Sequence, residues 1–169
     1  DRSDMAGFVK TDAAYRTTTP GVYAIGDVRG GPLLAHKAMA EGITLAEALG
    51  GSPEPRRFRA MPSCVYTDPE VATVGMTEQE AERRRRKVKV SRVPLSAVGR
   101  SLTLGRSEGF CKMVVDEKTD RVLGVGLLAP QADALIAEAA VAVELGLTAA
   151  KLGRVVHPHP TMSELLFEA

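Results

Sequence analysis

The segment from Gly109 to Leu147 constrains the fold more than any other part of the chain. It reads GFCKMVVDEKTDRVLGVGLLAP and continues as QADALIAEAAVAVELGL. The first stretch has two apolar, strand-like runs around the polar turn 116–120, a pattern that indicates a β-hairpin. The second stretch is a strongly apolar run with helical character, so it requires burial. Together they predict an α+β domain in which helices pack on an antiparallel sheet.

The segments around the hairpin add strands and short helices. Residues 63–76, SCVYTDPEVATVGM, indicate two short strands around an Asp-Pro turn, and residues 87–95, KVKVSRVPL, alternate as a strand does. Between them, Thr77 and Glu80 have the spacing of a capping box that opens a helix. A further short helix is expected at 148–152. Strands followed by helices, without regular βαβ alternation, again favour the antiparallel arrangement.

The beginning of the chain has a different pattern. Residues 7–12, GFVKTD, suggest a short strand, and the apolar run at 22–25 is typical of a buried parallel strand. Residues 33–49 have helical spacing and end at two glycines. A stretch rich in glycine, proline and charge follows, which is typical of a linker. We therefore divide the chain into residues 1–51, a linker at 52–59 and a second domain at 60–169.

The composition argues against several classes of protein. The 169 residues carry a formal net charge of +1, which gives no general attraction to nucleic acid or to a membrane. The basic run 83–87 follows several acids, so we favour a solvated helix face over a nucleic-acid patch. No apolar run is long enough to span a bilayer. Cys64 and Cys111 match neither a zinc pair nor a CxxC motif, so no metal site is predicted and a reducing, cytoplasmic location is expected.

Three features could contact a nucleotide or another anion. Residues 124–129, GVGLLA, match GxGxxA, but that fingerprint needs a helix directly afterwards, so we interpret these glycines as packing positions. Asp27 follows an apolar run, where its carboxylate could accept hydrogen bonds from ribose-like hydroxyls or cap the next turn. His36 lies at the start of the predicted helix, whose N-terminus could stabilise an anion. A structural, half-buried histidine is the simpler interpretation.

The C-terminal sequence HPHPTMSE, residues 157–164, has two interpretations. Thr161 and Glu164 have the spacing of a capping box. Alternatively, His159 is a base whose ring is oriented by the carboxylate of Glu164. The two roles compete for one carboxylate, and the residues alone do not decide between them.

Taken together, four stretches of the chain resemble the flavin-dependent pyridine nucleotide–disulfide oxidoreductases. These are TTTPGVYAIGDVRGGPLLAHKAMAEG, PSCVYTDPEVATVGMTEQEA, FCKMVVDEKTDRVLGVGLLAPQADALIAEAAVAVELG and HPHPTMSELLFEA. They occur in the family's order and cover nearly the whole chain. LAHKA and HPHPTMSE resemble the dihydrolipoamide dehydrogenase branch more than the glutathione or mercuric reductases.

The resemblance implies FAD as cofactor and NAD as co-substrate. It places Asp27 on the ribityl chain of FAD. The helix that opens at Leu34, Ala35 and His36 would face the flavin ring, where a helix N-terminus supports negative charge. The implied partner is the lipoyl group of a 2-oxoacid dehydrogenase complex.

The resemblance also implies a catalytic pair and a subunit interface. His159 corresponds to the family's acid–base group and Glu164 to its partner acid, and the His159–Pro160 bond would be cis. Residues 60–169 would form the homodimer and deliver this pair to the partner subunit's active site. Residues 1–51 would be the end of a FAD-binding domain.

The sequence also departs from the family's pattern. The glycine-rich FAD loop, the CxxxxC redox pair and the NAD domain are absent from these residues, so we expect a C-terminal fragment. The strands of residues 1–51 would then lack sheet partners. Cys64 and Cys111 do not match the redox pair and are expected to be buried, small apolar residues. Three hypotheses remain: part of a dihydrolipoamide dehydrogenase, part of another disulfide reductase of the family, or an inactive dimerisation module.

Overall fold

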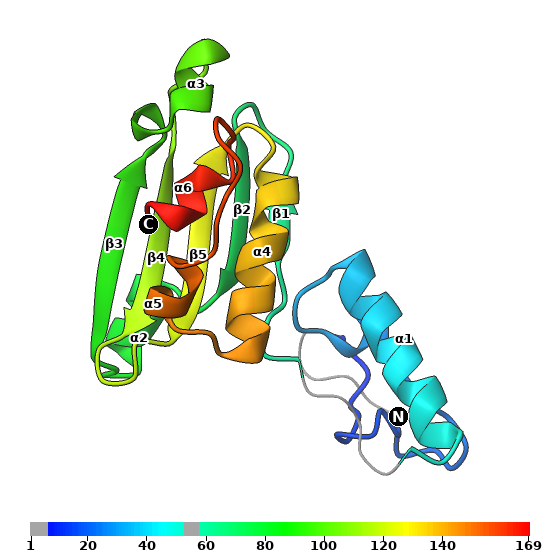
Figure 1. The fold of residues 1–169 in the computed structure, drawn as a ribbon. Coiled ribbons are helices and arrows are strands. Elements are labelled where there is room, and N and C mark those ends of the chain that lie inside the picture. Colours follow the sequence, from blue (N-terminus) through cyan, green and yellow to red (C-terminus); the bar gives the residue numbers. More distant parts are fainter. Residues whose placement is uncertain (1–6, 53–57) are drawn as a thin grey trace. The chain divides into compact units, whose positions relative to one another are not determined.

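The computed structural model describes residues 7–52 and 58–169 (Figure 1). The chain divides into two compact units, Asp1–Arg57 and Phe58–Ala169. Residues 53–57, which belong to the predicted linker at 52–59, lie outside the described residues, as do residues 1–6.

The second unit is built on a five-stranded antiparallel sheet with the order β1-β2-β5-β4-β3. Its strands are β1 (Ser63–Val65), β2 (Glu70–Gly75), β3 (Val88–Pro94), β4 (Phe110–Asp116) and β5 (Val122–Ala129). The predicted hairpin is formed by β4 and β5, and β1 and β2 flank the predicted Asp-Pro turn. The α+β class with an antiparallel sheet is therefore confirmed.

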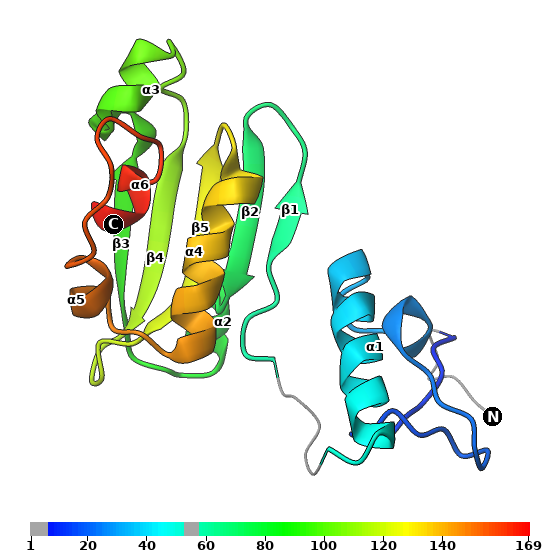
Figure 2. The ribbon, with the colours of Figure 1, turned by 45° about the vertical axis from the view of Figure 1, so that its right-hand side comes forward.

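Helices cover one face of this sheet. α4 (Ala132–Leu145) packs on β2 and β5, and α6 (Glu164–Phe167) packs on β4. Figures 1 and 2 show both helices on the same face. The core between sheet and helices includes Leu127, Ile136 and Leu165, all of them buried. This burial explains why the helical stretch after the hairpin is so strongly apolar.

Short helices occupy the connections between the longer elements. They are α2 (Glu78–Arg83), η2 (Leu95–Ala97), α3 (Gly99–Thr103) and α5 (Ala149–Leu152). The side chain of Thr77 accepts a hydrogen bond from the Glu80 amide at 3.1 Å, as the predicted cap requires. Thr148 caps α5 in the same way, accepting from the Lys151 amide at 3.2 Å.

The GxGxxA match lies inside strand β5, so no helix N-terminus follows it as a nucleotide fingerprint would require. A Cβ atom built at Gly124 would lie 2.2 Å from the backbone oxygen of Met76. Glycine is therefore needed here because two backbones approach closely, which confirms the packing interpretation for Gly124.

The first unit contains η1 (Gly26–Arg29) and α1 (Ala35–Leu49). α1 confirms the helix predicted at 33–49, although it begins two residues later than predicted.

The strands predicted at 7–12 and 22–25 are wrong. Within residues 7–52, the only β-pairing is the isolated bridge between Arg16 and Tyr23. A strand requires repeated pairing with a neighbouring strand. An apolar run without such neighbours stays irregular, whatever its propensity.

Candidate active site

The predicted catalytic residues lie on the connection from α5 to α6 and on α6 itself. Leu165 and Leu166 of α6 are buried in the core, and Met162 just before the helix is buried as well. These apolar anchors leave the preceding residue of α6, Glu164, at the edge of the core, with its side chain 19% exposed.

His159 and Glu164 are in direct contact. Nδ1 of His159 lies 2.8 Å from Oε1 of Glu164, while Oε2 of Glu164 accepts a hydrogen bond from the Thr161 amide at 2.8 Å. The two contacts that the sequence left as alternatives are therefore both present: Oε1 of Glu164 contacts the His159 ring, and Oε2 accepts from the Thr161 amide. The Thr161 amide, and next the His159 ring, lower the pKa of Glu164 below its ordinary value.

The predicted capping box is only half formed. Glu164 bonds back to the Thr161 amide, but the Thr161 hydroxyl donates to the carbonyl of Pro158 at 2.7 Å and contacts the Ser163 hydroxyl at 2.8 Å. α6 begins only after Ser163. These contacts tie the turn to itself and hold the Glu164 carboxylate beneath His159.

The other side of the His159 ring is open. The side chain is 74% exposed, and the ring lies beside Gly99 at the start of α3. Among residues 7–52 and 58–169, no group is hydrogen-bonded to Nε2. The His159–Pro160 peptide bond is cis, as the family resemblance implied. If Nδ1 donates to the carboxylate, Nε2 is left as a proton acceptor that faces out of this chain.

The neighbouring His157 has a different environment. Its Nε2 lies 2.8 Å from Oε1 of Glu138 on α4, and its Nδ1 lies 2.9 Å from the carbonyl oxygen of Val155. The side chain is only 6% exposed. Both ring nitrogens of His157 are occupied, so it has no free nitrogen to offer a substrate. Sequence reasoning did not identify Glu138, although a lone acid within the apolar run LIAEAAVAV is a signal of a buried polar contact.

Neither cysteine has the properties of a redox thiol. Both are free, and burial raises the pKa of Cys111 to about 12. The pKa of Cys64 is also raised, first by burial and then by the charges of Asp133 and Glu70. Low-pKa thiolates are the reactive form of cysteine. Cys111 is a core residue as expected, whereas Cys64 is only partly buried.

In the first unit, the predicted cofactor residues lie on η1 and at the start of α1. Asp27 is an exposed residue of η1. Leu34 directly precedes α1, and Ala35 and His36 are its first two residues. Within the described part of the chain, no side-chain cap bonds to this helix start. The first amides of a helix have no intrahelical acceptor, so they are available to an anionic or carbonyl group.

Two buried charged residues, which sequence reasoning missed, fasten η1 to α1. Lys37 donates to the carbonyl of Gly26 at 3.1 Å. Glu41 accepts from the Gly26 amide at 2.6 Å and from the Arg29 guanidinium at 2.7 Å. Lys37 and Glu41 are four residues apart on one helix, which is the spacing that could have revealed them. They hold the Asp27 segment against the first turns of α1.

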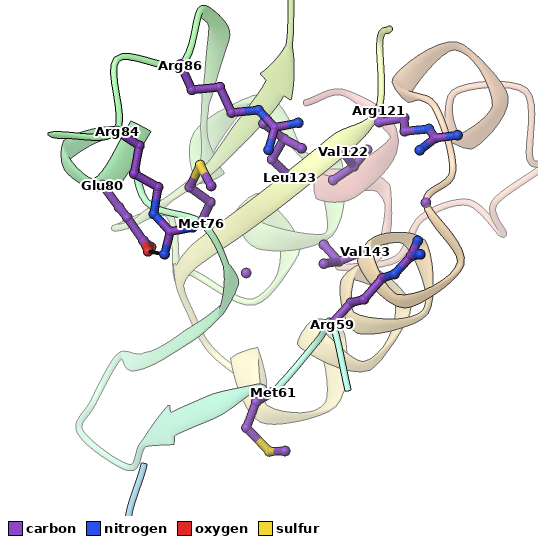
Figure 3. Close-up of a pocket in the computed structure, with 12 residues that line it drawn as sticks. Arg59, Met61, Met76, Glu80, Arg84, Arg86, Arg121, Val122, Leu123 and Val143 are labelled. Atoms are coloured by element: carbon purple, nitrogen blue, oxygen red, sulfur yellow. Dashed lines mark hydrogen bonds and ion pairs between the residues drawn. The ribbon is translucent and has the colours of Figure 1, made fainter. Parts of the chain in front are cut away.

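A separate basic pocket of about 560 Å³ lies in the second unit (Figure 3). Its lining includes the apolar side chains of Met61 and Val143. Four arginines also line it: Arg59, Arg84, Arg86 and Arg121. Two of these arginines belong to the basic run 83–87. Arg84 forms an ion pair with Glu80, and Arg86 lies 2.9 Å from Asp116. The helix ends at Arg83, so most of this run lies beyond the helix face on which we placed it.

Within 7–52 and 58–169, no three His, Cys, Asp or Glu side chains are grouped so that they could hold a metal ion. In the same part of the chain, no helix is long and apolar enough to cross a membrane.

The comparison with protein families agrees with this fold. Residues 61–169 match the model of the pyridine nucleotide-disulphide oxidoreductase dimerisation domain, and residues 3–42 match the model of pyridine nucleotide-disulphide oxidoreductase. The first match covers more than half of the chain. The chain therefore belongs to the pyridine nucleotide-disulphide oxidoreductase family.

Within this family, curated relatives include several dihydrolipoyl dehydrogenases. The enzyme of Thermus scotoductus is 53% identical over 166 residues, which cover 98% of this chain and 36% of that protein. The mitochondrial enzyme of Caenorhabditis elegans is 43% identical over 166 residues, covering 98% of this chain and 34% of that protein. The chain spans about a third of the length of the curated relatives it matches.

Solved structures give the same family. LpdA from Mycobacterium tuberculosis has a TM-score of 0.86 and 31% identity, covering 96% of this chain and 36% of LpdA. RclA from Escherichia coli, a HOCl-induced flavoprotein disulfide reductase, has a TM-score of 0.86 and 28% identity, covering 95% of this chain and 38% of RclA.

Proposed function

We propose that this chain is part of an FAD-dependent, NAD-linked dihydrolipoyl dehydrogenase. Residues 1–51 would belong to its FAD-binding domain and residues 60–169 to its interface domain. The observation that carries the proposal is the His159–Glu164 pair, with Nδ1 held by a carboxylate and Nε2 exposed. The names of the relatives, and their identity over nearly the whole chain, support this enzyme over other members of the family.

The proposed role of His159 is to move a proton at Nε2. A thiol of dihydrolipoamide gives its proton to Nε2, and the resulting thiolate would attack one sulfur of a redox disulfide elsewhere in the enzyme, forming a mixed disulfide while that S–S bond breaks and its other sulfur leaves as a thiolate. The ring becomes an imidazolium whose Nδ1–H points at Glu164, so the carboxylate stabilises the charge and fixes the orientation of the ring. In the reverse direction, the same ring returns the proton to the leaving thiolate.

The residues on η1 and α1 fit a flavin. Asp27 offers an exposed carboxylate that can accept hydrogen bonds from the hydroxyls of a ribityl chain. The amides at Leu34, Ala35 and His36 belong to a helix start, which favours negative charge on a group beside it. When bound, FAD supplies the two-electron carrier between the thiols and NAD, the proposed co-substrate.

The second unit is proposed to form the homodimer. Its exposed apolar side chains include Tyr66, Val141 and Leu145, and Val156 is 94% exposed. Exposed apolar side chains of this size support a protein–protein interface. In the dimer, residues 60–169 would present His159 to the partner subunit's flavin and redox cysteines. The lipoyl group of a 2-oxoacid dehydrogenase complex is the proposed substrate, and a cytoplasmic location remains our expectation.

His159→Gln in the full-length protein tests the proposal. We expect the variant to lose most dihydrolipoamide turnover while its FAD absorbance stays unchanged. Glu168→Gln, which alters an exposed acid near the end of the chain, is the control and should retain turnover. Near-normal turnover of His159→Gln would rule out the assigned role.

Two alternatives give different results. RclA is a flavoprotein disulfide reductase with a similar structure, so the full-length protein could act on another disulfide; it would then turn over that disulfide and not dihydrolipoamide. As an isolated chain, the protein could be an inactive dimerisation module. This module should be colourless and dimeric by light scattering, and tight FAD binding by the 169-residue chain would contradict it.

A further inference from the structure

The C-terminal segment contains a second, partly buried His–Glu pair, in which the Glu138 side chain is 33% exposed. His157 contacts Glu138 of α4 at 2.8 Å, and its side chain is 6% exposed, against 74% for His159. Its ring also lies near Phe167, with 5.7 Å between the ring centroids. A carboxylate and a backbone carbonyl face the two ring nitrogens, so each contact is satisfied when the nitrogen carries a proton. This pair is built into the packing of the unit.

The His157–Glu138 pair joins the C-terminal segment to α4. The 2.8 Å contact between His157 and Glu138 places the segment before α6 next to α4. The contact spans 19 positions of sequence and lies only two residues before His159. On the other side of His159, Met162 is buried in the core. His159 therefore lies on a short bridge between two fixed points.

The bridge itself has few free torsions. Pro158 and Pro160 flank His159, and each proline ring fixes its own φ. The Thr161 hydroxyl closes the bridge by donating to the Pro158 carbonyl at 2.7 Å. If His157 is displaced, the His159 ring is therefore displaced as well, because the backbone between the two residues has few torsions that can compensate.

One residue of each pair lines the same cavity. His157, Glu164 and Phe167 are among the residues that line a hollow of about 260 Å³. Movement of His157 in this space can reach the carboxylate that holds His159, as well as the backbone before it.

We propose that His157 and Glu138 are positioning residues that hold the His159–Glu164 pair at a fixed position relative to α4. The inference rests on the proposed function, because it concerns the geometry of the same acid–base group. A misplacement of about 1 Å at a catalytic group can lower a rate about a hundredfold. The His157–Glu138 pair would thus act on the rate of the thiol step without touching the substrate.

The test uses the full-length holoenzyme and separates its two half-reactions in stopped flow. The variants are His157→Leu, Glu138→Leu and the double variant, which leaves no buried polar group without a partner. We expect each to slow reduction by dihydrolipoamide between about tenfold and about a hundredfold, with reoxidation by NAD unchanged. Because the two side chains act as one unit, the double variant should be about as slow as either single variant.

A conservative variant distinguishes positioning from bulk stability. The amide of His157→Gln can still donate to Glu138, so this variant should recover most of the reduction rate. Lys118→Ala, which changes an exposed side chain in the turn between β4 and β5, is the control and should be reduced at the wild-type rate. Failure of the double variant to fold would overturn the inference, since the pair would then serve stability alone.

The two proposals fail in different ways. If His159→Gln is reduced by dihydrolipoamide at the wild-type rate, the proposed function is wrong. If His159→Gln is slow while the His157 and Glu138 variants match the wild type, the function stands and the positioning role is wrong.

Discussion

Leu165→Ala should destabilise the second unit and loosen the acid–base pair at the same time. Leu165 is completely buried on α6, directly after Glu164. The substitution removes three carbon groups, which corresponds to about 2.4 kcal/mol at about 0.8 kcal/mol for each. The unfilled cavity adds to this, so we expect a loss of about 3–4 kcal/mol in the free energy of unfolding. For a unit of this size, that lowers Tm by roughly 15 °C.

The assay is urea unfolding of the 169-residue chain followed by far-ultraviolet circular dichroism, because the chain contains no tryptophan. Measurements at two protein concentrations separate folding from association. Leu102→Ala is the control: it removes the same atoms from a leucine that is 62% exposed, and it should change the free energy of unfolding by less than about 0.5 kcal/mol. A loss below about 1 kcal/mol for Leu165→Ala would refute the conclusion that α6 is anchored through this side chain.

Three further results are expected. The pKa of Cys111 is about 12, so only about one Cys111 thiol in ten thousand is ionised at pH 8. Iodoacetamide should therefore modify Cys64 first, and Cys111 only in urea. Equal rates of modification in the folded protein would contradict this. Gly26→Ala should lower the Tm of the first unit more than Gly21→Ala. Both glycines have positive φ, but only at position 26 would a Cβ atom meet a helix side chain, that of Ala38 at 2.9 Å. Equal shifts in Tm would argue against that contact. Because the pKa of Glu164 is lowered, its carboxylate stabilises the folded state above pH 4.5, and this stabilisation is lost as the pH falls below 4.5. Glu164→Gln should therefore flatten the dependence of the free energy of unfolding on pH below 4.5. An unchanged pH dependence would count against the hydrogen bonds that hold this carboxylate.

The hairpin and the helix after it were predicted from sequence because their signals are local. Alternation, the polar turn and the apolar helical run each depend on residues close together in the chain. The cap predicted at Thr77 and the short helix predicted at 148–152 are local in the same sense, and the structure contains both. The strands predicted at 7–12 and 22–25 failed because a strand also needs a neighbour, which an apolar run does not specify.

The candidate site shows the same division. The motif HPHPTMSE identified His159 and Glu164, but it left a cap and an acid–base pair as competing explanations. In the structure, the two oxygens of one carboxylate make both contacts. A sequence names a carboxylate but not the direction of each of its oxygens, because that direction depends on how α6 packs against the sheet.

By itself, the sequence determined the α+β class of the second unit, the order of its main strands and helices, and the segment that contains His159 and Glu164. Only the tertiary structure decided that His157 is buried and paired while His159, two residues away, is exposed with a free nitrogen. The reason is that the partner of His157 comes from α4, 19 positions earlier in the chain. Local patterns determine which elements form, whereas burial and charge pairing depend on which distant segments the packed core brings together.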